Sequence, residues 1–94
     1  MNGGELLFLA LATCHCNDIY REAAKRGIQI DEVDVRVEGE FGAEGECAKQ
    51  IVYRPRVKAA ATDDEVRALI LHTDGVAEIH NTLRERVPVS LDYS

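Results

Sequence analysis

The sequence predicts one small α+β domain with the element order helix, strand, strand, helix, helix, strand. Three observations lead to this class. The N-terminal quarter is a run of good helix formers, the middle alternates apolar and charged residues, and the third quarter returns to a helical period. A chain of 94 residues has the size of one domain, and it contains no internal repeat or low-complexity tract.

The first predicted helix covers residues 5–26 and is expected to lie at the centre of the fold. Leu, Ala and Glu favour helix here, and Gly27 is a natural residue to follow its C-terminus. From Leu6 to Ala12 the helix is apolar on all sides, which is typical of a helix enclosed by protein. The apolar run is too short for a membrane span, which needs about 20 residues.

Two strands are predicted next, paired as an antiparallel hairpin. In the first strand three valines alternate with charged residues, so one face is expected to meet water: Val33, Val35 and Val37. A change of parity at residues 31–32 predicts a bulge before the regular strand. The second strand covers residues 49–61. Pro55 within it indicates an edge strand, a bulge or a shorter strand, because proline cannot donate to a ladder.

The C-terminal third is expected to contain two helices and a last strand. Thr62 and Glu65 have the spacing of a capping box, which begins a helix that ends at Gly75. A shorter helix is predicted over residues 76–84, and alternating apolar residues predict a strand over residues 87–93. These elements cannot cover a long apolar helix on every side, so we expect a second copy of the chain to cover the rest in a homodimer.

The composition argues against several kinds of partner. The net charge is -6, so no basic patch is available for nucleic acid or for an anionic membrane. Tryptophan is absent and the other aromatic residues are scattered, which disfavours a platform for stacking bases. No signal peptide is recognised, and an odd count of three cysteines disfavours a secreted disulfide framework. We therefore expect a cytoplasmic protein.

Two cysteines that flank a histidine in the first helix are the main candidates for chemistry. Cys14 lies on an inward stripe, where a free cysteine usually packs as a small hydrophobe, and its alternative role is that of a reactive thiol. Cys16 points about 200° away on a helix, so a disulfide between the two is not expected there. Cys47 lies in a turn rich in Gly and Glu and is expected to be exposed.

Metal binding and other cofactors are not expected. Zinc-binding cysteines usually come from a turn with two to four residues between them, whereas a single residue separates Cys14 from Cys16 inside a helix. The remaining histidines, His72 and His80, are expected to be surface or cap residues.

Three segments resemble the OsmC/Ohr family, the osmotically inducible protein C and organic hydroperoxide resistance proteins. Residues 5–14 and 22–40 resemble the family's first cysteine helix and the strand that follows it. Residues 80–89 resemble the segment after the family's second cysteine. The resemblance covers essentially the whole chain, residues 1–94, as a single OsmC-like domain. It implies that the family's N-terminal strands are lacking.

The resemblance also implies an assembly and an activity. Family members are intertwined homodimers in which sheets from both chains wrap around the cysteine helix. They are thiol peroxidases whose first cysteine attacks an organic hydroperoxide and then condenses, as a sulfenic acid, with the second cysteine. On this chain the resemblance implies Cys14 as the attacking residue, a small hydroperoxide as substrate and an external thiol as reductant.

Three functional residues of the family have no counterpart in this sequence. The position of the second cysteine falls on Ala77, and that of the active-site glutamate falls on Gly4, one residue from Glu5. The family's arginine belongs to the N-terminal strands. Without the second cysteine, an oxidised Cys14 would have to be resolved by Cys16, by Cys47 or by an external thiol.

A thiol among leucines and alanines is expected to have a raised pKa and to react slowly. We therefore expect efficient peroxidase activity only if a nearby arginine supplies a cation, the candidates being Arg21, Arg54 and Arg56. The alternative is a non-catalytic OsmC-like dimer that binds a small apolar ligand or is only structural.

Overall fold

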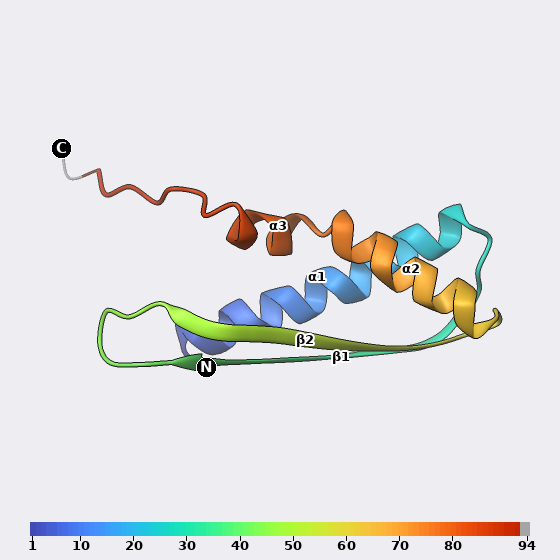
Figure 1. Cartoon of the computed structure of the whole chain (residues 1–94), viewed down its shortest axis with the longest axis horizontal. Coiled ribbons are helices and arrows are strands. Elements are labelled where there is room, and N and C mark those ends of the chain that lie inside the picture. Colours follow the sequence, from blue (N-terminus) through green and yellow to red (C-terminus); the bar gives the residue numbers. More distant parts are fainter. Residues whose placement is uncertain (93–94) are drawn as a thin grey trace.

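Three helices lie on one face of a long two-stranded hairpin in the computed structural model, which describes residues 1–92 (Figure 1). The described part of the chain measures 51 × 26 × 21 Å. The elements follow one another in this order: α1 (Gly3–Lys25), β1 (Ile30–Phe41), β2 (Ala48–Ala59), α2 (Asp63–Gly75) and α3 (Glu78–Arg84). The predicted α+β class and the order of these elements are confirmed.

The last predicted strand, over residues 87–93, is not formed in the described chain. Residues 87–92 have no regular structure and run away from the helices (Figure 1). Val89 is 98% exposed, and no strand in the described part of the chain lies beside it to form a ladder. An alternating pattern alone therefore did not make a strand here. Tyr93, the last residue of that predicted strand, lies outside the described residues.

Helix α1 begins two residues earlier than predicted because a capping box precedes it. The Asn2 side chain accepts a hydrogen bond from the Glu5 N–H at 2.9 Å, and the Glu5 carboxylate accepts one from the Asn2 N–H at 3.4 Å. At the other end, Gly27 takes a φ of +68° directly after the C-cap, as the sequence predicted.

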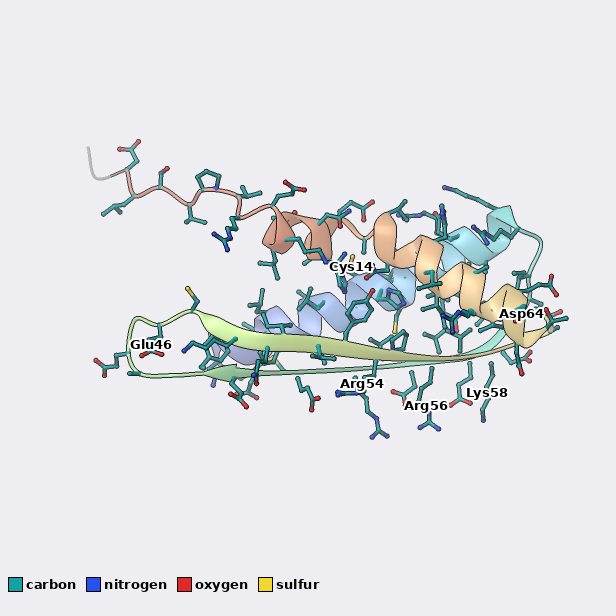
Figure 2. The ribbon with its side chains drawn as sticks, in the orientation of Figure 1. Cys14, Glu46, Arg54, Arg56, Lys58 and Asp64 are labelled. Atoms are coloured by element: carbon teal, nitrogen blue, oxygen red, sulfur yellow. The ribbon has the colours of Figure 1, made fainter. Side chains whose placement is uncertain are left out.

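The hairpin confirms the predicted pairing, the alternation and the bulge. Strands β1 and β2 are antiparallel, and each inward residue of β1 faces an inward residue of β2, as at Val33 and Val57. The register shifts between Ile30 and Glu32, where the bulge was expected, and shifts again between Glu38 and Glu40. The outer face carries charged side chains that point away from the helices, among them Arg54 and Lys58 (Figure 2).

The core lies between the C-terminal half of α1 and α2. Ile19 and Ala23 of α1 pack against Leu69 of α2, with residues from both strands around them. The apolar N-terminal half of α1 is not fully enclosed by this chain, as expected for a helix that these elements cannot cover on every side, since Leu6 is 53% exposed and Leu9 is 49% exposed. The hairpin covers only one side of that half. Within residues 1–92, no helix is both long enough and apolar enough to cross a bilayer.

The predicted capping box of α2 is present and gives a test of the fold. Thr62 Oγ1 accepts from the Glu65 N–H at 3.1 Å, and the Glu65 carboxylate accepts from the Thr62 N–H at 3.0 Å. Thr62→Ala removes the first bond, and we expect the free energy of unfolding to fall by about 1 kcal/mol in urea titrations. Thr62→Ser keeps the hydroxyl and should stay near the native value. Equal losses in both variants would contradict the capping role.

Candidate functional site

The Cys14 thiol lies in the middle of α1, at the place where this helix meets the start of α3. Its Sγ donates a hydrogen bond to Asp18 Oδ2 at 3.4 Å, because residues four apart share one face of a helix. The Ile79 backbone N–H, at the start of α3, donates a hydrogen bond to the same sulfur. The side chain is half-buried, so a small reagent can reach it once the neighbouring groups adjust. Figure 2 shows Cys14 between α1 and the C-terminal helices.

Two carboxylates surround this thiol. Ligand atoms of Cys14, Asp18 and Glu78 all lie within 4.8 Å of one another. The Arg21 guanidinium spans both carboxylates, since its Nη1 is 3.1 Å from Asp18 Oδ1 and 3.5 Å from Glu78 Oε1. Thiolate and carboxylate oxygens are a possible metal-ligand set, and here both carboxylates share the single cation of Arg21.

The surroundings keep the Cys14 thiol protonated. Burial raises its pKa, and the negative charges of Asp18 and Glu78 raise it further. The hydrogen bond from the Ile79 N–H acts in the opposite direction but does not cancel them. The raised pKa predicted from the sequence is confirmed. The prediction from the sequence was based on apolar neighbours alone, whereas in the structure the carboxylates of Asp18 and Glu78 also raise the pKa of Cys14.

Arg21 is the only one of the three candidate arginines that reaches this site. Its side chain extends from α1 toward Asp18 and Glu78. Arg54 forms an ion pair with Glu38 on the outer face of the hairpin, and Arg56 points away from the helices on the same face (Figure 2). Neither β2 arginine can compensate charge at Cys14 within this chain.

The other two cysteines lie elsewhere, and all three are free thiols. Cys16 turns toward β1, where burial and the carboxylate of Asp34 raise its pKa. Cys47 is exposed and follows Glu46 in the hairpin loop, which Figure 2 places at the end of the molecule far from Cys14. The structure therefore does not bring either cysteine to Cys14 within one chain.

Arg21 also contributes to a second charge cluster, which joins α1 to α2. The Glu22 carboxylate is buried and accepts from Arg21 Nε at 2.8 Å, and it lies 3.1 Å from Lys25 Nζ. His72 Nε2 of α2 lies 2.7 Å from the same carboxylate. Hydrogen bonds from Arg21, His72 and Lys25 hold the pKa of Glu22 down, at about 2. His72 is exposed, as predicted.

A buried aromatic cluster was missed by the sequence reasoning. His80 was expected at the surface but is only 4% exposed, and His15 is fully buried. Both rings pack against Tyr53 of β2, with ring centroids 4.4 Å and 4.9 Å away. The spacing of Leu11, His15 and Ile19 on one helix face was a usable signal for His15. His80 is buried by contacts across the fold, which no local pattern reveals.

The family assignment follows from a match over almost the entire sequence. The model of the family described as OsmC-like protein matches residues 1–92. The chain belongs to the OsmC-like protein family. No match was found among curated proteins.

Two solved structures share the fold of this OsmC-like chain. An OsmC-like protein from Mycoplasma pneumoniae aligns with a TM-score of 0.79 and 19% identity, over 89% of this chain and 62% of that one. An OsmC-like protein of unknown function from Vibrio cholerae O1 biovar eltor aligns with a TM-score of 0.65 and 19% identity, over 83% of this chain and 55% of that one. The chain thus spans less than two thirds of the length of either neighbour. The fold expected from the resemblance is confirmed.

The charges around the two helical cysteines predict a selective change in thiol acidity. Asp18→Asn removes a negative charge beside Cys14, so the pKa of Cys14 should fall and its thiolate fraction at neutral pH should rise. We expect faster alkylation of Cys14 by iodoacetamide across a pH series, read at each cysteine by mass spectrometry, with Cys16 unchanged.

Asp34→Asn is the matched control, because Asp34 acts on Cys16 instead. This substitution should accelerate the alkylation of Cys16 and leave the alkylation rate of Cys14 unchanged. Equal acceleration of both thiols by either substitution would contradict the assigned electrostatics.

Proposed function

We propose that this OsmC-like protein is a cytoplasmic, one-cysteine reductase of small organic hydroperoxides that acts as a homodimer. One observation carries the proposal: the Cys14 thiol donates to Asp18, and Asp18 is in turn held by Arg21. A nucleophile, a base within hydrogen-bond reach and a third group that orients the base make up the geometry of general-base catalysis, in which the thiol loses its proton only as the sulfur attacks.

The chemistry consists of an attack by sulfur on the peroxide. Asp18 takes the thiol proton as the Cys14 sulfur attacks the terminal oxygen of ROOH, which breaks the O–O bond. The alkoxide leaving group takes the proton back and departs as ROH, and Cys14 becomes a sulfenic acid. Sulfur is oxidised by two electrons and the peroxide is reduced by two. The Ile79 N–H stabilises the negative charge that develops on sulfur as the proton leaves.

The sulfenic acid is resolved by an external thiol. Ala77, at the position of the family's second cysteine, is a fully buried N-cap of α3 and offers no sulfur. One external thiol condenses with the sulfenic acid to give a mixed disulfide and water. A second thiol then releases Cys14 and leaves as a disulfide. Net charge -6 disfavours nucleic acid and anionic membranes as partners.

Exposed apolar surface supports the homodimer. Leu6 and Leu9 leave one side of α1 open to solvent, and the C-terminal segment 87–92 presents further apolar side chains without a neighbouring strand. Exposed apolar surface of this kind is a candidate for an interface. A second copy offers the same surfaces in return, as a two-fold interface requires.

A second candidate function is that of a non-catalytic OsmC-like dimer that binds a small apolar ligand or is only structural. The observation that favours it is the protonated state of Cys14, whose pKa is raised by burial and by two carboxylates. A thiol kept protonated is a poor nucleophile, because the thiolate is the reacting form.

A single-turnover reaction separates the two functions. Reduced protein is mixed with cumene hydroperoxide or hydrogen peroxide, and loss of each free thiol is followed by mass spectrometry. We expect rapid, stoichiometric loss at Cys14, faster with the organic peroxide, and none at that position in Cys14→Ser. Cys47→Ser is the matched control and should keep the native rate. A rate at Cys14 no faster than that of a cysteine in a short peptide would overturn the peroxidase proposal.

A further inference from the structure

A hollow opens between α1, β2 and α3, apart from the thiol site. Its volume is about 180 Å³, which suits a molecule with a single small ring. Cys14 does not line it. The walls are mostly apolar with a few polar groups, as in small-molecule sites generally. The lining residues are Leu11, Ile51, Tyr53, His80, Leu83 and Arg84.

The polar wall contains a group without a partner. His80 lines the hollow, and within residues 1–92 neither of its ring nitrogens has a hydrogen-bond partner or contact with solvent. The same is true of His15, whose ring lies 6.1 Å away, centroid to centroid. Leaving buried polar atoms unpaired is costly, so a buried imidazole of this kind requires an explanation such as a bound group.

The charges around the hollow are already balanced. Arg84 Nη2 lies 2.7 Å from Asp74 Oδ1, and Asp74 also accepts a hydrogen bond from the Tyr53 hydroxyl. Burial lowers the pKa of His80, which is therefore neutral at pH 7. A neutral imidazole has one donor and one acceptor nitrogen, and a ligand hydroxyl has the matching acceptor and donor. An anionic ligand would meet no unbalanced cation here.

We propose that this hollow binds a small neutral molecule with an apolar body and one hydroxyl group, an alcohol or phenol of about the size of benzyl alcohol. The body lies against Leu11, Ile51 and Leu83, and the hydroxyl pairs with His80 once the imidazole turns toward the hollow. The inference does not depend on the reaction proposed for Cys14.

The test is a titration of the full chain followed by backbone amide NMR shifts. Benzyl alcohol is compared with toluene, which lacks the hydroxyl, and with benzoate, which is charged. We expect benzyl alcohol to bind about tenfold more tightly than toluene, the ratio that one net hydrogen bond supplies, and benzoate to bind less tightly than benzyl alcohol. Shifts should centre on residues that line the hollow. Equal affinities for the first two probes, tighter binding of benzoate, or no binding would each overturn the proposal.

Four variants assign the effect to one imidazole. His80→Phe should abolish the preference for benzyl alcohol and retain toluene binding, while His80→Gln, which keeps a donor and an acceptor, should retain part of the preference. His15→Phe is the matched control, since His15 is equally buried and unpaired but does not line the hollow. Cys14→Ser should bind both probes like the native chain. A preference that survives in His80→Phe, or is lost in His15→Phe, would contradict the assignment.

Discussion

The ion pairs of Arg21 link α1 to α3 beside the Cys14 thiol. Its guanidinium bonds to Asp18 and Glu22, two buried carboxylates of α1, and lies 3.5 Å from Glu78 of α3. A buried carboxylate without a partner would be strongly destabilising, so this arrangement allows α1 to present acidic groups to the interior. The same cation holds the Asp18 carboxylate, which accepts the hydrogen bond from Cys14. One side chain therefore links the buried carboxylates of α1 to the thiol site.

The two halves of helix α1 are unusual because the more polar half is the more buried one. The C-terminal half is buried although it carries His15, Asp18 and Glu22, whereas the apolar N-terminal half is largely open. The buried polar stripe explains why the thiol lies among charges and not in a purely apolar core. The open apolar half leaves surface for a second copy of the chain. The proposed reactive thiol and the proposed homodimer interface both lie on this one helix.

Local signals in the sequence were sufficient for the helices and the hairpin. The capping box at Thr62, the glycine after α1 and the bulge near residues 31–32 each depend on neighbours in sequence, and each was predicted. The last strand was predicted from alternation but is not formed, because a strand needs a ladder partner and residues 1–92 do not provide one. His80 was misplaced because contacts with Tyr53 bury it across the fold. The ion pair of Arg21 with Asp18 follows helical spacing, but its contact with Glu78 depends on how α3 returns to α1.

The central claim is that Arg21 offsets the carboxylates that oppose ionisation of Cys14. The most direct measurement is the pH dependence of Cys14 alkylation in Arg21→Gln, compared with Arg54→Gln, which removes an arginine on the outer face of the hairpin. Loss of the cation leaves Asp18 and Glu78 uncompensated. The account therefore predicts a higher pKa of Cys14 and slower alkylation at neutral pH in Arg21→Gln, with no change in Arg54→Gln. An unchanged or lower pKa in Arg21→Gln would contradict it.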